Sequence, residues 1–218
     1  MVKIDYSLRM FDEIKKIKSL GRRPWLLLHL CCAPCSSYVI ELLQSHFEIV
    51  LYFYDPNIHP YSEYEKRRNE ASDHAANNDI PFIEGPYDVK NWCDLTKGHE
   101  NDPEKGERCA LCFDMRMSES ARFAGEIGCE YFATVLTISP HKDAARINNA
   151  GTGFAKKYGL KYLVSDFKKK DGFKKSIKLG KQYGFYRQDY CGCVYSRRNI
   201  KKFGLKGEGD VRLYNGKL

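Results

Sequence analysis

In this 218-residue chain, short apolar runs alternate with longer segments in which apolar residues recur at helical spacing. This pattern restricts the possible folds more than any other feature of the sequence. The apolar runs are predicted to be buried strands, at residues 24–30, 47–56, 80–85, 130–139 and 160–165. The segments between them are predicted to be helices, at residues 36–46, 62–78, 109–128 and 141–159. Strands that alternate with helices predict an α/β fold with a doubly wound, mostly parallel sheet.

The predicted sheet indicates where a binding site should lie, because ligands of such folds bind in a crevice at the carboxyl ends of the strands. The first strand ends at "HLCCAPCSS", where Ser36 is the expected N-cap of the next helix. Nucleotide-binding folds, of the nucleotide alpha-hydrolase (HUP-like) type, place a glycine- and serine-rich phosphate loop at this position. The loop here contains Pro34 and no glycine. It therefore indicates a nucleotide-type fold in which cysteines replace the phosphate loop.

Size and composition favour one globular domain. With 43% hydrophobic and 29% charged residues the chain is not disordered, and it has no apolar run long enough to cross a membrane. Residues 24–164 are expected to form the α/β core and residues 165–218 a smaller basic subdomain. The segment "MVKIDYSLRMFDEIKKIK" is amphipathic and unlike a signal peptide, so a cytoplasmic location is expected. In that reducing compartment, nine cysteines favour metal or redox roles over structural disulfides.

Charge is distributed unevenly along the chain. The net charge is +8, but residues 156–206 alone carry +13, which leaves the remainder net acidic at −5. A basic block of this kind attracts phosphates, although a solvated helical face is the alternative. Aromatic residues lie among the charges, as in "KQYGFYRQDY", and rings can stack on unpaired bases. This mixture favours a nucleic-acid partner.

Seven of the nine cysteines form three groups at the predicted ends of strands and helices: Cys31, Cys32 and Cys35; Cys109 and Cys112; and Cys191 and Cys193. The first group lies in a strand-to-helix turn, and the second opens a helix, where the helix dipole favours thiolates. A structural zinc ion needs only four ligands, usually in paired Cys-x-x-Cys knuckles. Seven thiols fit better with an iron–sulfur cluster plus further redox thiols or a second metal. Cys93 and Cys129 are expected to be packing residues.

The pair Cys191 and Cys193 has two interpretations. A disulfide across a single residue is strained and easily reduced, which suits a redox-active pair. Alternatively, both thiolates bind iron beside the cluster. The spacing alone leaves both interpretations open.

Five segments together resemble the cobalamin-independent epoxyqueuosine reductases, the QueH family: "LLLHLCCAPCSSYVIELL", "YFYDPNIHPYSEYEKR", "ERCALCFDMRM", "FATVLTISPHKD" and "FYRQDYCGCVYS". They occur in this order across residues 26–196. The combination of Cys-Cys, Cys-x-x-Cys and Cys-Gly-Cys is far more specific than any one of these motifs. The resemblance implies an oxidoreductase that acts on tRNA at the last step of queuosine synthesis, removing an epoxide oxygen from a modified anticodon base with two electrons and two protons.

The resemblance also implies the cofactor and its ligands. Carried over by position, the ligands of a 4Fe–4S cluster are Cys31, Cys32, Cys109 and Cys112, and the redox-active pair is Cys191 and Cys193. An alternative partition has a second iron bound by Cys31 or Cys32 together with Cys35 and Cys191. The candidate proton donors follow two strand ends: Tyr54, Asp55, His141 and Lys142. The expected partners are tRNA carrying epoxyqueuosine and an unidentified electron donor, with no membrane.

Two rival functions remain from the residues themselves. One is a cluster-dependent thiol–disulfide reductase that uses the same Cys-Gly-Cys pair on a protein partner. The other is a zinc-stabilised RNA-binding module without catalysis.

Overall fold

The computed structural model describes residues 4–197 of the chain; residues 1–3 and 198–218 are outside the described part. One sheet contains five strands, which are β1 (Trp25–Leu30), β2 (Glu48–Phe53), β3 (Phe82–Glu84), β4 (Tyr131–Thr134) and β5 (Lys161–Tyr162). Their spatial order is β3-β2-β1-β4-β5, and each neighbouring pair is parallel. The predicted parallel sheet is confirmed.

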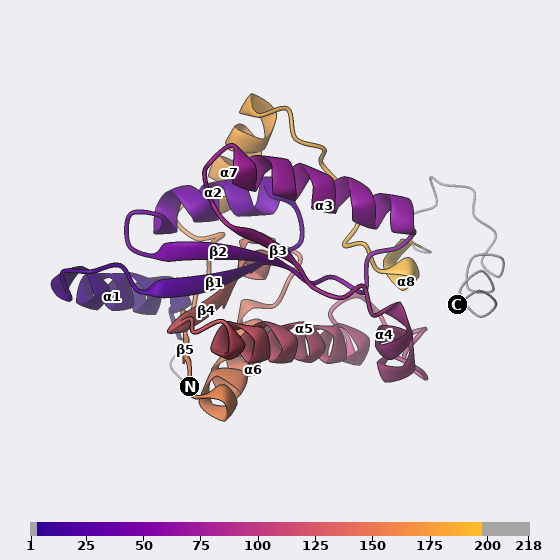
Figure 1. Cartoon of the computed structure of the whole chain (residues 1–218). Coiled ribbons are helices and arrows are strands. Elements are labelled where there is room, and N and C mark those ends of the chain that lie inside the picture. Colours follow the sequence, from indigo (N-terminus) through magenta and orange to yellow (C-terminus); the bar gives the residue numbers. More distant parts are fainter. Residues whose placement is uncertain (1–3, 198–218) are drawn as a thin grey trace.

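Helices cover both faces of this sheet, as Figure 1 shows. Their bounds are α1 (Tyr6–Ser19), α2 (Ala33–Leu43), α3 (Tyr61–Ala76), α4 (Val89–Leu95), α5 (Glu107–Glu126), α6 (Ala144–Tyr158), α7 (Gly172–Gln182) and α8 (Val194–Arg197). Helices α2, α3 and α7 lie on one face, and α5 and α6 lie on the other. The fold is therefore the doubly wound α/β architecture that the alternation predicts. Within residues 4–197 the structure contains no helix with the length and apolarity that a membrane span requires.

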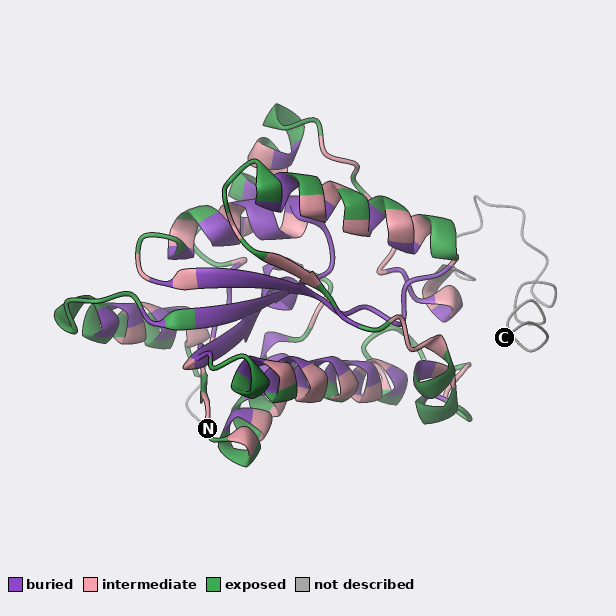
Figure 2. Ribbon diagram, viewed as in Figure 1, coloured by how far each residue is buried: buried purple, intermediate pink, exposed green. Residues whose placement is uncertain are grey.

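The central strand β1 is buried on both faces, which explains its nearly continuous apolar sequence. Only Trp25, at its start, is exposed, and the purple strands in Figure 2 show the same burial across β1 and β2. The imidazole of His29 is also buried here, among leucines. A polar group in such a position needs hydrogen-bond partners. They are the Thr134 hydroxyl, 2.7 Å from Nδ1, and Arg116, whose Nε donates to Nε2 at 3.3 Å.

The strand order reverses beside β1. The chain leaves β1 through α2 to β2 on one side, and returns after β3 through α5 to β4 on the other side. In doubly wound sheets the ligand crevice lies at such a switch point, outside the carboxyl ends of the two strands. Here those ends lead into Cys31 and into the segment that follows Thr134.

Several predicted boundaries are wrong, and one of them matters for chemistry. Helix α2 begins at Ala33, so its N-cap is Cys32 and not Ser36, whose hydroxyl instead donates to the Ala33 carbonyl at 3.0 Å. Pro34 explains the earlier start, because proline is favoured in the first turn of a helix, where no amide donor is needed. Cys35 is therefore held rigidly within the first helical turn.

The predicted strand at 130–139 is also too long. β4 ends at Thr134, and residues Val135–Ile138 form a 3-10 turn whose start is capped by the Thr134 hydroxyl, which accepts from the Leu136 amide at 3.2 Å. Helices α1, α4, α7 and α8 have no counterpart among the predicted elements.

The basic segment packs directly on the core, because α7 lies against α2. Residues 198–218 of this segment are outside the described residues. The division into a core at 24–164 and a subdomain at 165–218 therefore stays a prediction.

Candidate active site

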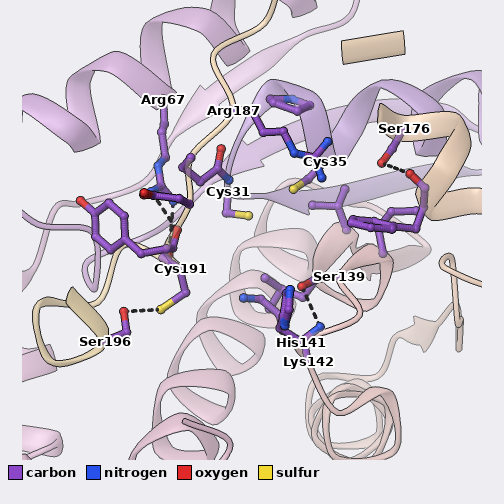
Figure 3. A pocket seen from close by; sticks show the side chains of 18 of the residues that line it. Cys31, Cys35, Arg67, Ser139, His141, Lys142, Ser176, Arg187, Cys191 and Ser196 are labelled. Carbon is purple, nitrogen blue, oxygen red and sulfur yellow. Dashed lines mark hydrogen bonds between the residues drawn. The ribbon is translucent and has the colours of Figure 1, made fainter. Parts of the chain in front are cut away.

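A cavity of about 410 Å³ opens at the carboxyl edge of the sheet, at the switch point between β1 and β4. One wall is formed by Cys31, Pro34 and Cys35 at the start of α2, and a second by residues 135–142 after β4. The third wall consists of α7 and an extended segment, residues 186–193, which we call the strap. Figure 3 shows Cys31 and Cys35 reaching this cavity from the start of α2, and Cys191 reaching it from the strap.

The first cysteine group is compact. The Sγ atoms of Cys31, Cys32 and Cys35 lie within 4.8 Å of one another, and among the described residues this is the one set of three His, Cys, Asp or Glu ligands so closely placed. Hydrogen bonds from the Cys32 and Cys35 thiols, and then the positive charges of Arg116 and Lys142, lower the pKa of Cys31 well below its ordinary value. Burial, and then the hydrogen bond to Cys31, raises the pKa of Cys32. Hydrogen bonds to Cys31 and Cys32, and then burial, raise the pKa of Cys35. Cys31 is therefore the thiol of this group that ionises first.

The other two cysteine groups meet in a second, smaller cavity of about 30 Å³. It is lined by Cys109 and Cys112 from the start of α5 and by Cys191 and Cys193 from the strap. The two cavities adjoin, because four residues line both: Glu104, His141, Lys142 and Cys191. All seven grouped cysteines thus surround one region, and Cys191 stands at its junction.

The predicted cluster ligands are distributed over this region and not gathered at one point. Cys31 and Cys32 belong to the compact group, whereas Cys109 and Cys112 line the smaller cavity. Both sets lie at helix N-termini, where the backbone dipole favours thiolates. This placement leaves the ligand set of Cys31, Cys32, Cys109 and Cys112 as a prediction.

Cys191 and Cys193 are free thiols, like all nine cysteines. The Cys193 amide donates to the Cys191 sulfur at 3.4 Å, and the Ser196 hydroxyl lies 3.2 Å from the same sulfur. Hydrogen bonding by Cys193 is the largest cause that lowers the pKa of Cys191. Between them, Gly192 has a φ of +103°, and a Cβ atom there would lie 2.7 Å from Ile58. Only glycine meets both conditions, so the Cys-Gly-Cys spacing is a backbone requirement.

Three buried arginines surround the thiols, with exposed fractions of 1% for Arg67, 2% for Arg108 and 3% for Arg116. Arg116 donates to the Asp55 carboxylate and to His29 Nε2, the latter at 3.3 Å, and it also bonds the Cys112 thiol. Burial, and then the charge of Arg116, lowers the pKa of His29 to about 3, so this imidazole is neutral. The buried histidine of β1 thus supports Arg116 beneath the site.

The four candidate proton donors separate into two pairs. Asp55 and Tyr54 line neither cavity, and Asp55 is fully buried in its ion pair with Arg116. Burial raises the pKa of Asp55 to about 7 although Arg116 opposes this shift. His141 and Lys142 line both cavities. The geometry therefore favours His141 and Lys142 over Asp55 and Tyr54 as groups that can reach a substrate.

Arg108 organises the polar loop that precedes Cys109. Its Nη1 donates to the carbonyl oxygens of His99, Glu100 and Asp102 at 3.0, 3.2 and 2.7 Å. The Asp102 carboxylate accepts from the Arg108 amide at 2.8 Å. A loop without regular structure is thereby wrapped around one guanidinium, which holds the start of α5 in place.

Comparison with known proteins agrees with this arrangement. Residues 26–199 match the family described as "Epoxyqueuosine reductase QueH". Relatives of that name are 41% identical in Streptococcus pyogenes, 46% identical in Haemophilus influenzae and 43% identical in Acinetobacter baylyi. The aligned regions cover 90%, 88% and 91% of this chain, and 79%, 79% and 92% of those relatives. The chain belongs to the QueH family.

A solved structure supports the fold of this QueH-family chain. The U34-tRNA thiolase NcsA from Methanococcus maripaludis, solved with its 4Fe–4S cluster, superposes with a TM-score of 0.51 at 15% identity. The match covers 83% of this chain and 65% of NcsA. At this identity the likeness concerns the fold alone, a parallel α/β sheet with helices on both faces. The nucleotide alpha-hydrolase type stays a prediction.

The charges and donors of the site fit a metal–sulfur group. Thiolates are the ligands of iron–sulfur clusters, and such a centre carries negative charge. The charged side chains that line the two cavities are six cations, Arg67, Lys105, Arg108, Arg116, Lys142 and Arg187, and two acids, Glu104 and Asp189. Even with Glu63 and Asp55, which pair with Arg67 and Arg116, six cations face four acids, so positive charge is in excess around the sulfurs. Asn57 Oδ1 beside the smaller cavity is buried and has no hydrogen-bond partner among the described residues. The cysteines of this QueH-family chain are thus a candidate metal or iron–sulfur site.

Sequence reasoning missed the residues that hold the cysteines. The three arginines and His29 have no motif that marks them, and Gln188, whose amide donates to the Cys32 sulfur at 3.0 Å, lies in a segment where only the aromatic and basic residues stood out. A buried position between two leucines was the one available signal for His29.

We expect Arg108→Met to lower the free energy of unfolding of the metal-free protein by about 2–4 kcal/mol, because three loop carbonyls lose their donor. Amide exchange should accelerate over residues 99–106. Arg122→Met, on the exposed side of the same helix, removes surface ion pairs with Glu119 and Glu126 and should cost less than about 1 kcal/mol. Urea unfolding and hydrogen exchange measure both effects. Equal losses in the two variants would contradict the assigned role of Arg108.

Proposed function

We propose that this protein reduces epoxyqueuosine in tRNA to queuosine. The observation that carries the proposal is the convergence of seven thiols on two adjoining cavities at the sheet's switch point, in a chain that matches the QueH family over residues 26–199. The family match supports this function over the two rivals, a thiol–disulfide reductase and a zinc-stabilised RNA-binding module. A cytoplasmic location is part of the proposal, because tRNA is the substrate.

The proposed cofactor is a 4Fe–4S cluster held by Cys31, Cys32, Cys109 and Cys112. When bound, such a cluster supplies electron transfer. The alternative with a second iron at Cys35 and Cys191 keeps the same cavity, because both residues line it. In either case Arg116 lies against the thiols from beneath and offsets the negative charge of the thiolates.

The proposed redox-active pair, Cys191 and Cys193, supplies the electrons and protons that the reaction consumes. Conversion of the epoxide to the alkene takes up two electrons and two protons and releases water. Oxidation of the Cys191 and Cys193 thiols to a disulfide yields two electrons and two protons, so the two half-reactions balance. An external electron donor must then reduce the disulfide for the next turnover.

Lys142 is the proposed proton donor to the leaving oxygen. Burial opposes its protonated form, but the negative charges of Cys191 and Cys31 outweigh this and raise the pKa of Lys142. A protonated ammonium group at the junction of both cavities is placed to donate a hydrogen bond to an epoxide oxygen. Asp55 is instead assigned to holding Arg116.

The tRNA is proposed to approach along α7. This helix contributes Phe173 and Ser176 to the cavity, and Arg187 of the strap stacks over the Phe173 ring with 5.4 Å between its Cζ and the ring centroid. Exposed lysines continue from this entrance along α7, at positions 174, 175, 178 and 181. A ring and cations beside a cavity suit an unpaired base and its phosphates.

The proposed function predicts brown protein after anaerobic purification, with iron and acid-labile sulfide in equal amounts. Incubated with a reductant and tRNA carrying epoxyqueuosine, this protein should yield queuosine, detected by mass analysis of the nucleosides. A colourless protein that contains zinc alone would support the RNA-binding module. Cluster-loaded protein that leaves the epoxide intact with a competent donor would refute the substrate assignment.

Cys191→Ser should abolish turnover and retain most of the visible absorbance of the cluster, because Cys191 is assigned outside the cluster. The matched control is Cys93→Ser, a half-buried cysteine that lines neither cavity and should leave turnover and spectrum unchanged. Visible spectra and single-turnover assays of the two variants provide the comparison. Loss of the cluster spectrum in Cys191→Ser would show that Cys191 is a cluster ligand.

Replacing Lys174, Lys178 and Lys181 by glutamine should weaken tRNA binding and make it less dependent on salt. The slope of log affinity against log salt concentration should become less steep by about 0.7–0.9 for each phosphate that a lysine no longer neutralises. The control replaces Lys15, Lys16 and Lys18 on α1, which do not line the cavity, and should leave both values unchanged. Titrations at several salt concentrations measure the slope. Unchanged affinity of the α7 variant at low salt would identify these lysines as a solvated face.

A further inference from the structure

Arg67 is buried on α3, yet its guanidinium faces the strap and not the apolar core of the sheet. Its Nη1 and Nη2 donate to two consecutive carbonyl oxygens, those of Cys191 and Tyr190, each at 3.2 Å. Its Nε donates to the Glu63 carboxylate at 2.7 Å, one turn earlier on the same helix. Figure 3 shows Arg67 bonded to the backbone directly beside the Cys191 side chain.

Burying a guanidinium is costly unless its charge is paired and its N–H groups are bonded. Glu63 supplies the counter-charge, and the two strap carbonyls accept hydrogen bonds from Nη1 and Nη2 of the guanidinium. The guanidinium group is planar and rigid, so it fixes the positions of two neighbouring peptide groups at once. Because it binds carbonyl oxygens, it determines where the backbone of the Cys-Gly-Cys turn lies.

Other contacts attach the strap to the same helix and to the turn before it. The Glu70 carboxylate accepts from the Tyr186 amide at 2.6 Å, and Lys66 lies 3.3 Å from the centre of the Tyr186 ring. At the other end, the His59 amide donates to the Gly192 carbonyl at 2.8 Å, and the Tyr190 hydroxyl donates to the His59 carbonyl at 2.6 Å. Arg67 lies between these two attachments, next to Cys191.

Two side chains of the strap depend on this placement. Cys191 reaches the junction of both cavities, and Gln188 donates to the Cys32 sulfur at 3.0 Å. Strap residues reach the α2 cysteines on one side and the α5 cysteines on the other. A displacement of the strap would therefore move the redox thiol relative to both.

We propose that Arg67 is the positioning residue that holds the Cys-Gly-Cys turn over the Cys31, Cys32 and Cys35 group, through the carbonyl oxygens of Tyr190 and Cys191. It acts through the strap and touches no reacting atom. The kinetic consequence rests on the proposed function, whereas the effect on the position and reactivity of Cys191 does not.

The test compares Arg67→Lys and Arg67→Met with Arg68→Met in the full-length, metal-free protein. Lysine keeps the charge beside Glu63 but cannot bond both carbonyls, and Arg68 contacts Asn69 and Glu84 instead of the strap. The rate of alkylation of Cys191 by iodoacetamide at one fixed pH is followed by peptide mass analysis. Cys129, buried before β4 and far along the chain from the strap, reports on the global fold.

Both Arg67 variants should alkylate Cys191 about tenfold faster through local opening of the strap, with Cys129 unchanged. Arg68→Met should match the unaltered protein at both cysteines. If Arg67→Met fails to fold, Arg67→Lys decides the question alone. An unchanged Cys191 rate in Arg67→Lys would overturn the proposal, and so would parallel acceleration at Cys191 and Cys129, which would assign Arg67 to the whole fold.

With cluster-loaded protein, Arg67→Lys should lower kcat on the order of 100-fold, because misplacement of about 1 Å has an effect of this size. The KM for tRNA should stay within about twofold, because Arg67 is 1% exposed and is paired with Glu63, so it offers no surface charge to a phosphate. Failure of the unaltered protein to reduce epoxyqueuosine would reject the proposed function and leave the alkylation result standing. Equal losses in kcat and in tRNA affinity would overturn the positioning role.

Discussion

Desolvated positive charge beside sulfur is the interaction on which this site depends. Arg67, Arg108 and Arg116 are each almost fully buried. Arg67 lies next to Cys191, Arg116 bonds Cys112, and Arg108 holds the loop that precedes Cys109. Guanidinium groups cannot lose their charge, so every one of them must be bonded where it lies. The fold meets this demand with carbonyl oxygens, two carboxylates and the His29 ring, except at Arg108 Nε, which has no hydrogen-bond partner among the described residues. The bonds of Arg67 and Arg108 also hold the backbone that carries cysteines. One network of hydrogen bonds and ion pairs therefore both stabilises the thiolates and positions the thiols.

Much of the fold could be predicted from the sequence, because strands and helices that pack in layers each have a characteristic spacing of apolar residues. A strand covered on both faces, such as β1, must be apolar throughout, and helices on a sheet must repeat every three to four residues. The place of the site also followed, since a parallel sheet has its crevice at the carboxyl ends of the strands. The QueH resemblance is confirmed by the match over residues 26–199.

The network behind the cysteines could not be predicted in this way. Arg67 and Arg68 are adjacent in a charged helix, and nothing in the sequence shows that the first is buried and the second half-exposed. Asp55 follows a strand, as catalytic acids of such folds do, but its partner Arg116 lies 61 positions further along the chain. Long-range pairings of this kind depend on how the layers pack, and this packing produces no periodic pattern in the local sequence. The start of α2 is different, because Pro34 is a local signal that competes there with the capping preference of the serine at position 36.

The distribution of the seven thiols over the fold suggests a division of roles. Five of them lie at or beside the N-termini of α2 and α5, where the helices and the sheet fix the backbone. The other two belong to the strap, which is attached through hydrogen bonds of a few side chains and one backbone amide. Ligands of a metal–sulfur centre need an unchanging geometry, whereas a pair that alternates between two thiols and a disulfide must bring its sulfurs from van der Waals contact to about 2.05 Å and back. Rigid elements suit the first task and an anchored loop suits the second, so the placement of Cys191 and Cys193 on the strap supports the proposal of a redox pair beside a fixed centre.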